Sequence, residues 1–261
     1  MIKLLDLLME AKGQKKAIVM AGGAGVGKST FVKKIRPDLQ KSGWVELNAD
    51  KYVEDPESDM FNNLAKASNR IDKIDLPETV KSSKNFLYDT TASNVDRILS
   101  IRDNGYDVMM VMIYTNPIVS FLRNFSRERK VPTVGVLSSW NNIYKNIDTY
   151  KKAFGNNFYL VQTSMTPEEE KMVKEFEKAF KQGKLKEFFE NILSSGQFKS
   201  TFRKDPTKKK SPEEIAKSKA LVDKQIDILA GQFDKIEKDV ERVKPQTMDQ
   251  VASKAKSFIT K

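Results

Sequence analysis

The residues best suited to chemistry stand in one stretch near the start of the chain, GGAGVGKST at positions 22–30. This stretch fits the spacing G-x-x-x-x-G-K-[ST], which is typical of a loop that holds phosphate. Glycines let backbone N–H groups turn toward phosphate oxygens, and a lysine adds a mobile ammonium. The alternative is a glycine-rich turn that binds nothing. We predict a nucleotide-phosphate site made of Gly22, Gly23, Ala24, Gly25, Val26, Gly27, Lys28, Ser29 and Thr30. In this site we expect Ser29 to ligate Mg²⁺ directly.

Two aspartates follow other apolar runs of the chain. Asp50 comes shortly after Trp44–Leu47, and Asp89 follows Asn85–Tyr88. Open α/β sheets bind their ligands at the carboxyl ends of the strands, and phosphoryl transfer needs a carboxylate to orient the attacking hydroxyl. We expect Asp50 in that catalytic role and Asp89 on a water of the Mg²⁺ shell. Helix capping by Asp50 and turn capping by Asp89 are the structural alternatives.

A basic segment, FLRNFSRERKVP at 121–132, carries two arginines four residues apart, Arg123 and Arg127. Residues at this spacing share one helix face, and two guanidiniums there would offset charge on a transferring phosphoryl group. The alternative is a solvated basic face paired with Glu128.

Composition excludes several kinds of chemistry. The 261 residues include no cysteine and no histidine, so disulfides, thiolate nucleophiles and imidazole bases are absent. The net charge of +11 favours polyanionic partners such as nucleic acid, although simple solubility is the alternative. No run approaches the roughly 20 apolar residues of a membrane span. We therefore expect a cytoplasmic protein without a membrane partner, and an amphipathic helix over residues 1–12.

The elements that must position these residues alternate along the first part of the chain. Apolar runs predict strands at Ala17–Met20, Trp44–Leu47, Asn85–Tyr88, Val108–Tyr114 and Phe158–Val161. Helices are predicted at Lys28–Ile35, Ser58–Asp72, Ser93–Asn104, Pro117–Arg129 and Val134–Phe154, with Ser93 as a cap and Asn104-Gly105 as a stop. Such alternation indicates an α/β domain over residues 1–165, built on a mostly parallel five-stranded sheet between helices.

After Thr163 the strands give way to an all-helical extension over residues 166–261. We predict a helix at Pro167–Leu193, a basic linker at 199–212 and a long helix over 212–243. The apolar residues of this last helix alternate at spacings of four and three, which is typical of a coiled-coil seam. The seam predicts either self-association or packing against the chain's own helices.

The loop alone does not name a reaction. The chain has neither the Asn-Lys-x-Asp nor the Asp-x-x-Gly segment of a GTPase, and no acidic pair follows Val108–Tyr114 as in motor ATPases. A small kinase that uses ATP and Mg²⁺ fits what remains.

Taken together, these motifs resemble the 5′-hydroxyl kinase domain of phage-type polynucleotide kinase and, more loosely, the zeta-toxin-like kinases. Asn48, Asp50 and Tyr52 match an Asn-x-Asp-x-Tyr segment, and the resemblance makes Asp50 the general base. It also assigns an acceptor-side or supporting role to Asp89, Thr90 and Arg97. The arginine pair then lies in a lid at about 117–132.

The resemblance implies a P-loop kinase with a three-layer sandwich, in the host cytoplasm if a phage encodes it. The expected reaction is transfer of the γ-phosphate of ATP to a hydroxyl of a nucleic acid or nucleotide, with a polynucleotide 5′ end or a modified DNA base as the first acceptors. One alternative is a nucleotide-gated module that binds nucleic acid or protein through Lys208–Lys210 and the helical tail. Another is a zeta-toxin-like kinase of nucleotide sugars.

Overall fold

The computed structural model describes residues 14–55, 57–60, 63–128, 130–194 and 211–261. The helix expected over residues 1–12 lies outside this part of the chain, as does the linker 199–212 apart from its last two residues. Among the described residues, no helix combines the length and the apolar character that crossing a membrane requires.

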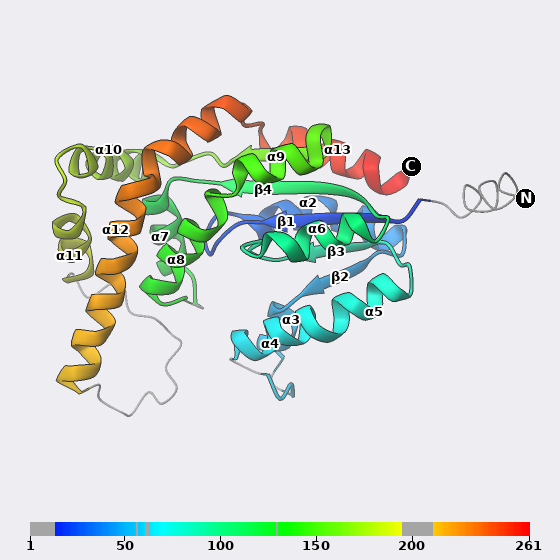
Figure 1. Ribbon diagram of the computed structural model, residues 1–261, viewed down its shortest axis with the longest axis horizontal. Helices are drawn as coiled ribbons and strands as arrows, with labels where there is room; N and C mark the ends of the chain where they lie inside the picture. The colour runs from blue at the N-terminus through cyan, green and yellow to red at the C-terminus, as the bar shows by residue number, and fades with distance from the viewer. Residues whose placement is uncertain (1–13, 56, 61–62, 129, 195–210) are drawn as a thin grey trace, which may run out of the picture.

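The centre of the molecule is a five-stranded parallel sheet with the strand order β2-β3-β1-β4-β5. Its strands are β1 (Lys16–Ala21), β2 (Val45–Asn48), β3 (Phe86–Asp89), β4 (Asp107–Tyr114) and β5 (Phe158–Gln162). All five predicted strands are confirmed, as is their parallel pairing. Their carboxyl ends point toward helices α7 (Pro117–Phe125) and α8 (Thr133–Tyr144) in Figure 1.

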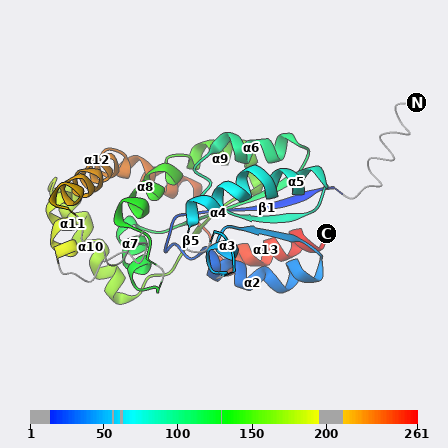
Figure 2. The same cartoon turned by 90° about the horizontal axis from the view of Figure 1, so that it is seen from below.

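Helices cover both faces of the sheet. Successive side chains of a strand point to opposite faces, and here apolar side chains lie on both. Ala17 and Val19 of β1 belong to one apolar cluster, whereas Ile18 and Met20 belong to the other. Figure 2 shows α2 (Lys28–Lys41) and α13 (Met248–Thr260) on one side, and α6 (Val95–Asp103) with α9 (Ile147–Phe154) on the other. The predicted three-layer arrangement is confirmed.

The helix predicted over Ser58–Asp72 is wrong in its limits. The described segment instead contains α3 (Asp50–Val53), α4 (Leu64–Arg70), the π-helical turn η1 (Ile71–Asp75) and α5 (Leu76–Lys81). Helix α4 begins where the side chain of Asn63 accepts a hydrogen bond from the backbone N–H of Lys66 at 3.1 Å. A local cap, which apolar periodicity does not reveal, therefore decides where this helix starts.

Other helix ends also differ from the sequence prediction. Asn94, not Ser93, caps α6, because its side chain accepts from the backbone N–H of Arg97 at 3.1 Å. The stop at Asn104-Gly105 is confirmed by the left-handed φ of 82° at Gly105. Helix α7 ends at Phe125, and the predicted Val134–Phe154 is divided into α8 and α9.

The predicted helix Pro167–Leu193 is two helices, α10 (Pro167–Lys181) and α11 (Leu185–Ser194), since Gly183 adopts a left-handed φ of 68° between them. The long helix α12 (Pro212–Val243) begins and ends as predicted. Its seam is buried within the chain against α8, α9 and α11. The buried seam residues are Ile226, Leu229, Phe233, Ile236 and Val240. Packing against the chain's own helices is therefore the alternative that the structure supports.

The sequence predicted an all-helical extension, but neither the separate helix α13 nor the return of the chain to the sheet before it. The backbone N–H of Gln246 donates to Leu160 at 2.8 Å, and its carbonyl accepts from Gln162 at 3.2 Å, so the chain returns along the edge of β5. Helix α13 then buries Val251 and Ala255 against α2. Residues of the extension thus share the two apolar clusters of the sheet.

Candidate active site

The phosphate loop connects β1 to α2 and lies against α7. Gly25 has a φ of 79°, and a Cβ atom there would lie 2.4 Å from the backbone oxygen of Ser120. The hydroxyl of Ser120 donates to the carbonyl of Ala24 at 2.6 Å. Glycine is therefore required at position 25 both by the backbone conformation and by the close approach of α7.

Lys28 begins α2 and turns back into the loop. Its Nζ donates to the carbonyls of Gly22 at 2.7 Å and Gly23 at 3.2 Å, and lies 3.9 Å from Oδ1 of Asp89. The cap position of α2 is Gly27, which has no side chain to occupy the first N–H groups of the helix. This helix start can therefore receive an anion, the arrangement that a phosphate loop requires.

Asn48 contacts both aspartates expected from the sequence, Asp50 through its backbone and Asp89 through its carboxylate. Its Oδ1 accepts from the backbone N–H of Asp50 at 2.9 Å, and its Nδ2 donates to Oδ2 of Asp89 at 3.4 Å. Asp50 is the first residue of α3 and the cap position is Ala49, so Asp50 does not serve as the helix cap. Parallel pairing places Asn48 beside Asp89, at the carboxyl edge of the sheet.

Burial changes the acid strength of Asp89. Loss of hydration raises the pKa of this carboxyl to about 6, with the nearby Lys28 acting in the opposite direction and Asp50 in the same direction. A carboxylate held this deep is stabilised when a cation reaches it.

One cavity of about 770 Å³ opens between the loop and the neighbouring strand ends. The predicted site residues that line it are Gly23, Ala24, Gly25, Gly27, Lys28, Ser29, Thr30, Asp50, Asp89, Thr90, Arg97, Arg123 and Arg127. Gly22 and Val26 are buried behind the lining, and Val26 packs in the apolar cluster under α2. The structure therefore gathers the predicted residues around one space.

Two residues that the sequence did not predict, Asp72 and Tyr88, line the cavity together with the predicted Thr90 and Arg97. Asp72, in the π turn η1, accepts from the Tyr88 hydroxyl and is paired with Arg97. Thr90 lies beside them and lines the same cavity. A π turn changes the direction of the side chains within a helix and is frequent at functional sites. No motif announced Asp72, because its partners are 16 and 25 residues away.

Helix α7 bears Arg123 but ends at Phe125, so Arg127 follows the helix and the two arginines do not share one helix face as predicted. Ile118 and Phe121 of α7 are fully buried. Asn124 accepts from the Val131 backbone N–H and donates to its carbonyl, and so closes the following segment back onto the helix. The role of residues 117–132 as a lid stays a prediction.

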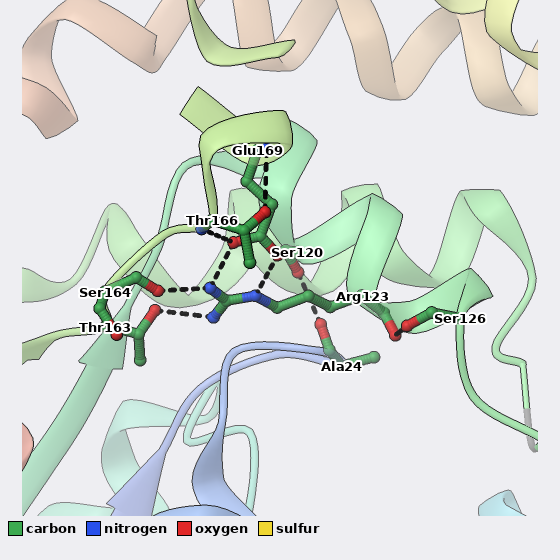
Figure 3. A network of polar contacts seen from close by, with 8 residues as sticks. All are labelled: Ala24, Ser120, Arg123, Ser126, Thr163, Ser164, Thr166 and Glu169. Atoms are coloured by element: carbon green, nitrogen blue, oxygen red, sulfur yellow. Dashed lines mark hydrogen bonds and ion pairs between the residues drawn. The ribbon is translucent and has the colours of Figure 1, made fainter. Parts of the chain in front are cut away.

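The two arginines have different surroundings. Nη2 of Arg127 donates to Oδ1 of Asn124 at 3.0 Å. Arg123 instead makes a two-pronged ion pair with Glu169 of α10, in which Nε and Nη2 each lie 2.7 Å from a carboxylate oxygen (Figure 3). Glu169 thus contacts a residue of the cavity lining, and its only local signal in the sequence was its place in the first turn of a predicted helix.

The sequence pattern of the zeta toxin family matches residues 4–164. The chain belongs to the zeta toxin family. Of the two resemblances seen in the sequence, the looser one is thus confirmed, while that to phage polynucleotide kinase stays a prediction. Arg123 lies inside the matched segment and Glu169 lies outside it.

Solved structures with similar folds accompany this family match. The PezAT toxin–antitoxin system of Streptococcus pneumoniae aligns at 16% identity over 68% of this chain and 91% of that chain, with a TM-score of 0.43. The AvrRxo1-ORF1:-ORF2 structure with ATP aligns at 16% identity over 85% and 80%, with a TM-score of 0.46. Shikimate kinase from Acinetobacter baumannii aligns at 13% identity over 67% and 98%, with a TM-score of 0.37. No curated protein sequence gives a significant match to this zeta toxin family member.

Proposed function

We propose that this zeta toxin family member is an ATP- and Mg²⁺-dependent kinase that phosphorylates a hydroxyl of a nucleotide or nucleic acid. One observation carries the proposal: the phosphate loop and the Asp50 carboxylate line a single cavity. Phosphoryl transfer is mostly a matter of positioning and charge stabilisation, and the cavity offers groups for both. Motifs that only bind a nucleotide would not need a carboxylate opposite the loop.

Each group has a role in the proposed transfer. The loop N–H groups and Lys28 hold the triphosphate, and Asp50 orients the acceptor hydroxyl and takes its proton. The acceptor oxygen bonds to the γ-phosphorus as the bond to the β–γ bridging oxygen breaks, which leaves ADP. Arg123 and Arg127 both line this cavity, and their positive charge would stabilise the phosphoryl oxygens.

The residues present also fit a magnesium ion that accompanies the nucleotide. The described residues hold no group of three or more acidic, histidine or cysteine side chains for a protein-only metal site. Mg²⁺ in kinases takes one or two protein oxygens and completes its shell with phosphate and water. The Ser29 hydroxyl and, through water, the Asp89 carboxylate are the protein groups for it, and the ion would neutralise phosphate charge.

The acceptor is proposed from the polar cluster around Asp72. Arg97, held by Asp72, suits an acceptor that carries its own phosphate, such as a polynucleotide end. A modified base in DNA fits the same class. Nucleotide sugars are the second candidate class, because the family match is consistent with the zeta-toxin-like alternative. The nucleotide-gated binding module stays a prediction, since its basic segment lies outside the described residues.

The test is transfer of labelled γ-phosphate from ATP to a panel of 5′-hydroxyl DNA, 5′-hydroxyl RNA, hydroxymethylated DNA, free nucleosides and nucleotide sugars. We expect one acceptor class to be labelled in the presence of Mg²⁺. Asp50→Asn should lose transfer while it still binds ATP, and Asp103→Asn, an exposed carboxylate far from the cavity lining, should behave as wild type. Full transfer by Asp50→Asn, or none by wild type with any acceptor, would refute the proposal.

A further inference from the structure

The guanidinium of Arg123 is held on its edge by three residues that follow β5. Besides the two bonds to Glu169, Nη1 donates to the Thr163 hydroxyl at 2.9 Å and Nη2 to the Ser164 carbonyl at 2.6 Å. A guanidinium has five N–H groups. Among the described residues, these contacts occupy four of them, and the one that remains is on Nη1.

Glu169 is itself fixed in place. Its Oε2 accepts from the backbone N–H of Thr166 at 3.0 Å, while its own N–H donates to the Thr166 hydroxyl at 3.3 Å, which forms a capping box at the start of α10. The ion pair with Arg123 lowers the pKa of this carboxyl, so it stays charged. The helix start adds a favourable field for the negative charge.

This clamp stands beside the phosphate loop. A Cβ atom on Gly25 would lie 3.3 Å from Cβ of Arg123, and one on Gly27 would lie 3.4 Å from the Thr163 methyl group. Figure 3 shows Arg123 reaching across the loop that bears Ala24 toward Thr163 and Ser164, with Glu169 above it. An arginine side chain loses conformational entropy when it is held in one position. The bidentate pair with Glu169 already orders Arg123 before a nucleotide binds.

We infer that Glu169 is a positioning residue of the nucleotide site: it holds Arg123 so that the free N–H on Nη1 and the flat guanidinium face meet the bound nucleotide. The inference rests on the proposed function, because it concerns the same site. The inference also gives the extension, which lies beyond the residues that match the family, a part in the nucleotide site through Glu169 of α10. The extension is then required for full nucleotide affinity and not only for packing.

The test is Glu169→Gln in the full chain. Glutamine preserves the capping box, because its amide oxygen can accept from Thr166, but it removes the charge and the second acceptor for Arg123. We expect the affinity for a non-hydrolysable ATP analogue, measured by calorimetry, to fall about ten-fold. The KM for ATP should rise by a similar factor, with a much smaller change in the KM for the acceptor. Glu168→Gln and Glu170→Gln, exposed on the same helical turn, should match wild type.

A double variant separates positioning from simple structural support. If Glu169 acts through Arg123, then adding Glu169→Gln to Arg123→Ala should cause no further loss of affinity. Wild-type affinity in Glu169→Gln, or tighter binding because the carboxylate competes with the nucleotide for Arg123, would overturn the inference. So would additive losses in the double variant. If wild type binds the analogue but labels no acceptor, only the proposed transfer fails. If wild type does not bind it, both fail.

Discussion

Asp89 and Lys28 form a close pair of opposite charges at the carboxyl edge of the sheet, with 3.9 Å between Oδ1 and Nζ. The pair is nevertheless not enough to keep Asp89 a normal acid, because burial raises its pKa to about 6 from a usual value of 3.8. Lys28 donates its hydrogen bonds to the carbonyls of Gly22 and Gly23 and reaches Asp89 only as an ion pair, so it compensates the carboxylate only in part.

The stability of the ligand-free protein should therefore depend on Asp89 in a definite direction. The folded state binds the Asp89 proton more tightly than the unfolded state does, so this group lowers the free energy of unfolding as the pH rises from about 4 to 6. The effect is on the order of 3 kcal/mol. Asp89→Asn should remove it, as measured by urea unfolding across this range. Asp103→Asn serves as the exposed control, and identical pH profiles for wild type and Asp89→Asn would contradict the prediction.

Gly25→Ala should abolish nucleotide binding without unfolding the protein. The new methyl group would meet the Ser120 backbone oxygen at 2.4 Å in a left-handed conformation, so loop and α7 must separate at a cost of about 1–3 kcal/mol. Calorimetry with the ATP analogue measures the loss. Gly231→Ala, in α12, adds a carbon that meets no atom within 4 Å apart from the adjacent residues and the backbone of its own helix, so it should instead stabilise the chain by about 1 kcal/mol. Normal nucleotide affinity in Gly25→Ala would show that the loop has another conformation.

Asp72→Asn should weaken binding of the acceptor and leave binding of ATP unchanged. The substitution leaves Arg97 without its counter-charge and Tyr88 with a weaker acceptor, so the acceptor side loses its order. We expect a roughly ten-fold higher KM for the acceptor and an unchanged KM for ATP in the transfer assay. Asp96→Asn, exposed on the first turn of α6, is the matched control. An effect on the KM for ATP alone would place Asp72 on the donor side.

Phe176→Ala should destabilise the sheet and the extension together. Phe176 is fully buried in α10, packs edge-on against Phe189 and Phe233, and belongs to the cluster that also contains strand residues. The expected cost is about 3–5 kcal/mol in one cooperative denaturant transition followed by tryptophan fluorescence. Ile215→Ala, at a half-exposed position, should change stability by less than about 0.5 kcal/mol. Two separate transitions would indicate that the extension folds as its own domain.

The sequence predicted those parts of the site that depend on residues close together in the chain. The loop from Gly22 to Ser29 needs glycines at fixed positions, and strands such as Val108–Tyr114 are continuous apolar runs, so spacing alone reveals both. Asp50 and Asp89 could be placed together because parallel strands end at the same edge. Their proposed roles in catalysis remain predictions.

The remaining parts depend on contacts between distant segments. Arg123 lies 46 residues from Glu169, so no local sequence pattern could predict that the two form an ion pair. The helix α13 was missed because its buried face uses small residues such as Ala252 and Ala255, which give a weak periodic signal. Its position under the sheet is set by tertiary packing on α2, which propensity does not report.

The return of the chain at Gln246 has a practical consequence for handling the protein. Gln246 pairs with Leu160 and Gln162 and so shields the edge strand β5. Helix α13 then covers the apolar surface of α2. Cutting the chain before Gln246 would expose the unpaired edge of β5 next to an apolar surface on α2. Both features favour aggregation between copies of the chain. A truncation that removes Gln246 and α13 is therefore expected to lower solubility.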